Sequence, residues 1–113
     1  FYTRSSGLPV PHRVETAEEV ARVSKSLTRV DSGLLLTVPI PEADELDAAE
    51  LDGVLEAALA ECDASGITGA AVTPYVLGRI GAATEGRSVP ANLSLAENNA
   101  VVAAEVAVAI ARS

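Results

Sequence analysis

Apolar residues recur at helical spacing in the stretch that follows Thr16. The positions three or four residues apart are Val20, Val23, Leu27 and Val30. Glu19 stands three residues after Thr16, which is the spacing of a capping box, where each side chain accepts a hydrogen bond from the other residue's backbone N–H. The pattern predicts a surface helix over residues 17–29.

Two more helices are predicted further along the chain. Residues 47–64 repeat apolar side chains every three or four positions, and Gly66 follows where a left-handed C-cap is expected. Thr73 and Pro74 have the order of an N-cap and a first helical residue, which predicts a helix that runs to about Ala83.

The last helix is predicted over residues 92–112 and is apolar on most sides. Residues 100–110 of this helix are apolar except at Glu105. Other structure must cover such a helix, because soluble proteins seldom expose large apolar patches. We expect that cover to come from elsewhere in the same polypeptide or from a neighbouring subunit.

A short buried sheet is expected between these helices. Residues 34–38 form a continuous apolar run that stops at Pro39, a pattern typical of a strand buried on both faces. Residues 1–14 are expected to hold the end of a strand and a loop. Because a helix followed by a short link and a buried strand favours parallel pairing, the predicted fold class is α/β, with short buried parallel strands and flanking helices.

Composition and charge narrow the possible partners and compartment. The net charge is −8, which argues against nucleic-acid binding because that affinity comes largely from Lys and Arg on phosphates. We find no uninterrupted apolar run of about 18 residues, so no membrane partner is expected. Cys62 is the single cysteine, which excludes an internal disulfide framework and fits a reducing compartment. The chain is therefore expected to be cytoplasmic.

Most residues with reactive side chains have simpler structural explanations. The acidic residues Asp44, Glu45, Asp47 and Glu50 lack the glycine and ligand spacing of a calcium loop, and favourable interaction with a helix dipole explains carboxylates at a helix start. His12 lies in a proline-rich loop, Lys25 on a polar helix side and Cys62 on an apolar stripe. We therefore predict neither a catalytic residue nor a metal ligand in this chain.

Two polar clusters remain as candidates for ligand contact. The opening FYTRSSG combines aromatic, hydroxyl and guanidinium groups around Arg4, a mixture suited to a sugar phosphate. The second cluster is Asn92, Asn98 and Asn99, on a helix that is otherwise mainly apolar. Two structural alternatives stay open: Asn92 as an N-cap, and Asn98 with Asn99 as a solvent-facing pair.

Four sequence blocks, taken in order, resemble the pseudouridine-5'-phosphate glycosidase family, also called the indigoidine synthase A-like family. The blocks are FYTRSSG at residues 1–7, VPIPEADELD at 38–47, GITGAAVTPY at 66–75 and ANLSLAENNA at 91–100. The resemblance covers the whole chain and implies that residues 1–113 are the carboxyl-terminal part of a single domain. It also implies the α/β/α sandwich fold of a homotrimeric, manganese-dependent enzyme.

The resemblance implies a reversible reaction in which pseudouridine 5'-phosphate and water give uracil and ribose 5-phosphate. The family is understood to use a lysine amine that forms an imine with the opened ribose, together with acidic residues that move protons. Those residues and the manganese ligands lie earlier in the family's sequence, and Lys25 matches none of them. The family pattern leaves this chain a substrate-binding role, carried by Asn98, Asn99, Asn92 and Arg4.

Two departures from the family pattern keep other functions open. Val38 stands where the family usually has Asn, and Ala70 stands where it usually has Lys. These changes allow a diverged glycosidase that acts on another sugar phosphate. The apolar last helix allows a third interpretation, a non-catalytic oligomerisation or interaction module.

Overall fold

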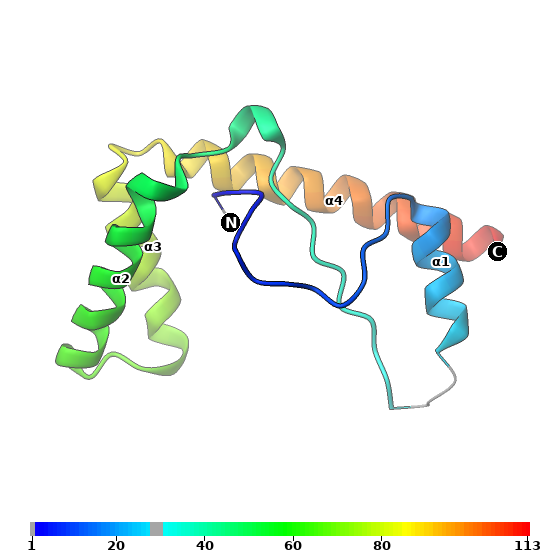
Figure 1. Ribbon diagram of the computed structural model, residues 1–113, viewed down its shortest axis with the longest axis horizontal. Helices are drawn as coiled ribbons and strands as arrows, with labels where there is room; N and C mark the ends of the chain where they lie inside the picture. Colours follow the sequence, from blue (N-terminus) through cyan, green and yellow to red (C-terminus); the bar gives the residue numbers. More distant parts are fainter. Residues whose placement is uncertain (1, 28–30) are drawn as a thin grey trace.

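The computed structural model describes residues 2–27 and 31–113 and places one long helix, α4, along the length of the molecule (Figure 1). Helices α2 and α3 form an antiparallel pair beside the first turns of α4, and α1 packs near its end. Irregular chain crosses the space between these two ends. The elements in chain order are α1 (Ala17–Ser26), η1 (Glu42–Asp44), α2 (Ala48–Ser65), η2 (Gly69–Ala71), α3 (Val72–Ala83) and α4 (Ser88–Arg112).

The helix boundaries follow from local capping interactions. Thr16 Oγ1 accepts from the Glu19 N–H at 3.2 Å and Glu19 Oε2 accepts from the Thr16 N–H at 3.3 Å, which confirms the predicted capping box of α1. Asp47 caps α2 by accepting from the Ala49 N–H at 2.9 Å. Gly66 ends α2 with φ of 67°, the left-handed conformation predicted for this glycine.

A buried threonine joins α3 to α4. Thr84 is fully buried, and its hydroxyl donates to the Ile80 carbonyl at 2.9 Å while accepting from the Ser88 N–H at 3.1 Å. Gly86 has φ of 84°, a conformation that costs glycine little, and its N–H donates to the Gly81 carbonyl at 2.9 Å. The hydroxyl therefore satisfies polar backbone groups on both sides of the turn.

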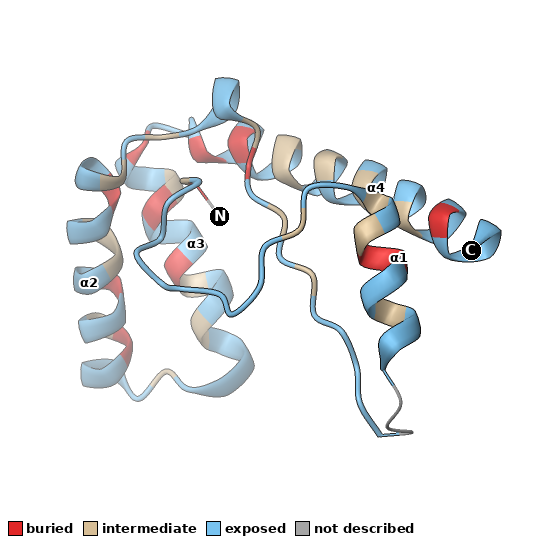
Figure 2. Ribbon diagram, turned by 45° about the vertical axis from the view of Figure 1, so that its right-hand side comes forward, coloured by how far each residue is buried: buried red, intermediate tan, exposed pale blue. Residues whose placement is uncertain are grey.

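Most buried apolar side chains gather at the two ends of the molecule and not in one central core (Figure 2), and Ile40 of the irregular chain is buried as well. The larger group lies between α2 and α3 and consists of Tyr2, Leu51, Ala58, Cys62, Val76 and Ile80. At the other end, α1 lies against α4 and buries Val20 and Ala21. Between the two ends, irregular chain lies below the middle of α4.

The prediction of an α/β fold, part of an α/β/α sandwich, is wrong for the described chain, which contains helices and no strand. Residues 34–38, the expected buried strand, are irregular, and Leu35 is 88% exposed. Residues 2–14, where the end of a strand was expected, form no strand either. A strand requires a neighbour that pairs with its backbone, and no described segment forms a backbone hydrogen bond with residues 34–38.

Three helix boundaries differ from the sequence prediction. Helix α1 ends at Ser26, and residues 28 and 29 of the predicted helix lie outside the described residues, as do Phe1 and residue 30. Helix α3 begins one residue before Thr73. Helix α4 begins at Ser88, with Pro90 in its first turn, where a missing N–H costs no helical hydrogen bond.

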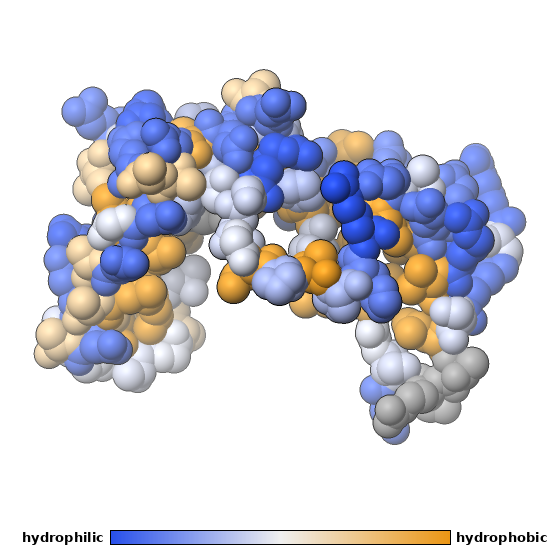
Figure 3. All heavy atoms as spheres, viewed as in Figure 1, coloured by the Kyte–Doolittle hydropathy of each residue, from blue (hydrophilic) through white to orange (hydrophobic). Residues whose placement is uncertain are grey.

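The molecule is more open than an independent domain of its length. Its radius of gyration is 17.0 Å, whereas a compact domain of this size has about 13 Å. Its accessible surface is 7985 Å², and the scaling for folded monomers of its mass gives about 5,800 Å². Figure 3 shows apolar atoms on the α2–α3 end and on the central chain, with an open gap between them. Much of this surface is suited to contact with further protein.

Helix α4 carries a large part of this exposed apolar surface. Val89, Leu93, Val101 and Val108 are all exposed, with Leu93 at 59%. By length and composition alone α4 could cross a membrane, but a helix in the core of a soluble protein has the same properties. The expected absence of a membrane partner therefore stays a prediction.

The Thr84 link predicts a stability difference between two matched substitutions. Thr84→Val keeps the side-chain volume but leaves the buried Ser88 N–H without its acceptor, so we expect the free energy of unfolding to fall by about 1–3 kcal/mol. Thr73→Val, at an exposed position in the first turn of α3, is the control and should stay within about 0.5 kcal/mol. Urea unfolding of both variants measures the difference, and equal stabilities would contradict the proposed link.

Candidate functional site

The candidate site lies where three segments far apart in the sequence meet. The segment that begins at Tyr2 runs beside residues 39–46, and both lie beside the first half of α4 (Figure 1). The Leu46 N–H donates to the Tyr2 carbonyl at 2.8 Å, which aligns the first two segments. The buried ring of Tyr2 packs in the α2–α3 core, and its hydroxyl donates to Asp52 at 3.2 Å. One side of the site is therefore anchored to the helix pair.

Glu45 holds the residues that follow Tyr2. Its Oε1 atom accepts from the Arg4 backbone N–H at 2.6 Å and from the Thr3 hydroxyl at 2.8 Å. The Arg4 guanidinium turns the other way and donates to the Ile40 carbonyl at 2.9 Å. Arg4 is thus fixed at both its backbone and its side chain, while Ser5 and Ser6 beyond it are exposed.

Asn98 of α4 contacts the residue next to Ile40. Its Nδ2 atom donates to the Pro39 carbonyl at 3.2 Å, next to the Ile40 carbonyl that accepts from Arg4. Two of the four predicted ligand-binding residues therefore meet at consecutive carbonyls. Both bonds are to protein backbone, so Arg4 and Asn98 shape the site through the Pro39–Ile40 segment.

Ser94 adds a second contact between α4 and this region. It lies four residues before Asn98, on the same side of the helix, and its hydroxyl donates to Asp44 Oδ2 at 2.5 Å. Sequence reasoning missed Ser94, Thr3 and the role of Glu45, although all three lie inside the blocks that resemble the family. The spacing of four residues between Ser94 and Asn98 is the signal that could have added Ser94 to the candidates.

Asn92 and Asn99 are not brought into this cluster. Both are exposed on α4, and neither side chain forms a hydrogen bond with the described part of the chain. Asn92 is not an N-cap, because α4 begins four residues before it. The two residues are seven apart and share one helix face, where their amides are accessible to other groups.

Hydrogen bonding alters the acid–base behaviour of three residues near the site and the α2–α3 pair. The Arg4 backbone N–H, and next the Thr3 hydroxyl, lower the pKa of Glu45 because both stabilise the charged carboxylate. Burial, followed by the bond to Asp52, raises the pKa of Tyr2. The bond to Glu61 raises the pKa of Tyr75. Glu45 is therefore an ionised acceptor at neutral pH.

The other residues with reactive side chains occupy the structural positions that the sequence predicted for them. Cys62 is buried in the α2–α3 core, Lys25 is exposed in the last turn of α1, and His12 is exposed in the loop before α1. No group of three or more His, Cys, Asp or Glu side chains in the described ranges is placed to hold a metal ion. The described residues therefore do not fit a manganese site.

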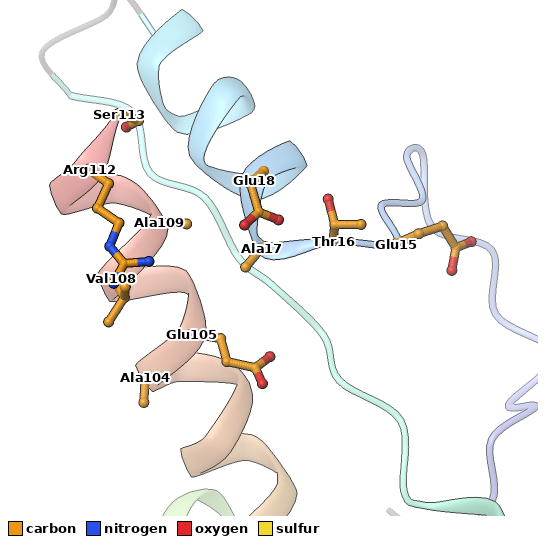
Figure 4. A pocket seen from close by; sticks show the side chains of 10 residues that line it. All are labelled: Glu15, Thr16, Ala17, Glu18, Ala104, Glu105, Val108, Ala109, Arg112 and Ser113. Atoms are coloured by element: carbon orange, nitrogen blue, oxygen red, sulfur yellow. The ribbon is translucent and has the colours of Figure 1, made fainter.

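An open groove of about 790 Å³ lies at the far end of α4, between that helix and the start of α1 (Figure 4). Its lining includes Glu18, Glu105 and Arg112. The groove shares no residue with the cluster of Arg4, Glu45, Ser94 and Asn98. It therefore adds nothing to the candidate site.

Comparison with known proteins identifies similar chains over nearly the full length. The family model described as "Indigoidine synthase A like protein" matches residues 1–109. A pseudouridine-5'-phosphate glycosidase from Methylobacterium nodulans is 43% identical over 112 residues, covering 97% of this chain and 33% of that protein. The enzyme of the same name from a Nocardioides strain is 47% identical over 109 residues, covering 95% of this chain and 36% of that protein.

A solved structure is also similar. The crystal structure of the prealnumycin C-glycosynthase AlnA in complex with ribulose 5-phosphate matches with a TM-score of 0.80 and 35% identity. The match covers 97% of this chain and 37% of that one. The chain thus spans about a third of the length of the curated relatives and of this neighbour.

The hydrogen bonds to Glu45 predict how its carboxyl group titrates. Because its folded pKa lies below the ordinary value of 4.5, its contribution to stability is present above that pH and is lost as the pH falls through the folded pKa. Thr3→Val removes one donor and should move the pKa of Glu45 upward. Carboxyl NMR titration of both proteins tests this, and an unchanged pKa would contradict the Thr3 contribution.

Proposed function

Since the chain belongs to the indigoidine synthase A-like family, we propose that it is part of a pseudouridine-5'-phosphate glycosidase. The proposed reaction converts pseudouridine 5'-phosphate and water reversibly into uracil and ribose 5-phosphate, with cleavage of a carbon–carbon glycosidic bond. The observation that carries this proposal is the match over nearly the whole chain to proteins of that name. The similarity to a C-glycosynthase in complex with ribulose 5-phosphate supports a sugar-phosphate substrate.

In this proposal the chain shapes the substrate side of the active site. The Thr3–Gly7 loop supplies hydroxyl groups, backbone N–H groups and a guanidinium, all of which suit phosphate and sugar oxygens. The structure supports this role because Glu45 and the Ile40 carbonyl fix the base of the loop while Ser5 and Ser6 stay exposed. Arg4 is the cation of this cluster, which matters for a phosphate in a chain with a net charge of −8.

The asparagines of α4 divide into two roles in the same proposal. Asn98 positions the Pro39–Ile40 segment through its bond to the Pro39 carbonyl. Asn99 and Asn92 keep amides that the described chain does not use, and these are the amides proposed to contact substrate. Asn98 therefore acts on the backbone of the site, whereas Asn92 and Asn99 are proposed to act on the substrate.

The remaining chemistry is assigned to other parts of the complete protein. We propose that the residues that break the bond and those that hold manganese lie outside these 113 residues. The exposed surface of α4 supports further contact with the same polypeptide or with neighbouring subunits of a homotrimer. A cytoplasmic location without a membrane partner is part of the proposal, because Glu97, Asn98 and Glu105 would be costly in hydrocarbon.

Two alternatives each rest on a specific observation. A diverged glycosidase with another sugar-phosphate substrate is favoured by Val38, which directly precedes the Pro39 carbonyl that accepts from Asn98. Ala70, the second departure, lies in η2, in the connection between α2 and α3. A non-catalytic interaction module is favoured by the exposed apolar residues of α4. Assay of the complete protein distinguishes all three.

The test of the proposed function is release of uracil from pseudouridine 5'-phosphate in the presence of manganese. We expect release by the complete polypeptide and none by the 113-residue chain, which lacks a candidate nucleophile. Release from a different C-nucleotide alone would favour the diverged enzyme. No release from any such substrate would favour the interaction module.

The division among the asparagines predicts different kinetic effects in the complete protein. Asn99→Ala should raise KM or lower kcat by about two- to tenfold, because one amide contact contributes about 0.5–1.5 kcal/mol. Asn98→Ala should have an effect of similar size and also destabilise the protein, since it releases the Pro39 carbonyl. Glu97→Gln, on the same turn of α4, is the control. Unchanged kinetics and stability in both Asn variants would remove this assignment.

A further inference from the structure

One carboxylate oxygen outside the Thr3–Gly7 loop binds two of its residues. Glu45 Oε1 accepts from the Arg4 N–H at 2.6 Å and from the Thr3 hydroxyl at 2.8 Å, so one atom joins two consecutive residues of the loop. The Thr3 hydroxyl in turn accepts from the Ser5 N–H at 3.3 Å. Glu45 therefore holds the backbone at the start of the loop, while the Ile40 carbonyl holds the Arg4 side chain.

Glu45 is itself held by the backbone on both sides. Its N–H donates to the Glu42 carbonyl at 3.4 Å, which closes the η1 turn, and the next residue, Leu46, donates to the Tyr2 carbonyl at 2.8 Å. Shortly after Leu46 α2 begins, capped by Asp47. The carboxylate thus sits on a short, fixed segment between η1 and α2, a suitable base for orienting a neighbouring loop.

Glu45 binds the backbone of Arg4 and not its guanidinium. A carboxylate that accepts from the Arg4 backbone leaves the guanidinium free to turn toward the Ile40 carbonyl, where it donates through one nitrogen at 2.9 Å. A guanidinium carries five N–H donors, so this bond leaves most of them for an anionic ligand. The lowered pKa of Glu45 agrees with a carboxylate that stays charged in this arrangement.

We propose that Glu45 is a positioning residue that holds the Thr3–Gly7 loop in the conformation that binds the substrate's sugar phosphate. The inference rests on the proposed function and names a residue that acts through Thr3 and Arg4, without touching the substrate. Its loss therefore weakens substrate binding more than it slows the bond-breaking step. A side chain that keeps the acceptor oxygen at this position preserves most of the effect.

Three variants of the complete protein test the proposal. Glu45→Ala removes the acceptor, Glu45→Gln keeps an acceptor oxygen without the charge, and Glu42→Ala is a matched control in η1 whose side chain forms no hydrogen bond with the described part of the loop. The first readout is hydrogen exchange of the Arg4 amide. We expect it to accelerate by about tenfold in Glu45→Ala, by less than about threefold in Glu45→Gln and hardly at all in Glu42→Ala.

The second readout is binding of ribose 5-phosphate, followed by calorimetry and independent of turnover. Glu45→Ala should weaken its Kd by about three- to tenfold, and Glu45→Gln should restore most of that loss. With pseudouridine 5'-phosphate as substrate, KM should rise by a similar factor while kcat stays within about twofold.

The outcomes separate this inference from the proposed function. Wild-type protein that binds ribose 5-phosphate without releasing uracil contradicts the reaction, while a weaker Kd in Glu45→Ala still supports the positioning role. Unchanged Arg4 exchange in Glu45→Ala overturns the inference. Faster exchange with unchanged ribose 5-phosphate binding overturns it too, because the loop would then not take the sugar phosphate.

Discussion

The Pro39–Ile40 segment is the point on which the rest of the candidate site depends. Its two consecutive carbonyls accept from Asn98 of α4 and from Arg4 of the opening segment, residues 94 positions apart in the sequence. Proline at 39 and 41 removes two backbone donors, so the segment offers carbonyls without competing N–H groups at those positions. Helix, segment and loop are thereby held together by side chains that each donate to backbone.

The open shape explains why such links matter. Apolar contacts lie at the two ends of the molecule, and the middle is irregular chain beside a long helix. Hydrogen bonds between exposed groups contribute modestly, so contacts with other protein surface must add to them. The exposed apolar residues of α4 are suited to those contacts. This agrees with a chain that spans about a third of the length of its relatives.

Local signals in the sequence were sufficient for the helices and insufficient for the sheet. The Thr16–Glu19 capping box and Gly66 after α2 were predicted from nearby residues, because capping interactions span only a few positions. The apolar run at 34–38 suggested a strand, but strand formation depends on a distant partner that the described chain does not supply. Glu45 was missed for a similar reason: its partners Thr3 and Arg4 lie about 40 residues away, and its acidic neighbours had a simpler explanation.

Coupling between Arg4 and Asn98 tests the central role of the Pro39–Ile40 segment most directly. Arg4→Ala, Asn98→Ala and the double variant of the complete protein would be compared by their free energies of unfolding. Because both side chains hold the same segment, the account predicts that the double variant loses less than the sum of the single losses, by about 0.5 kcal/mol or more. Additive losses would show that the two residues act independently and would contradict the account.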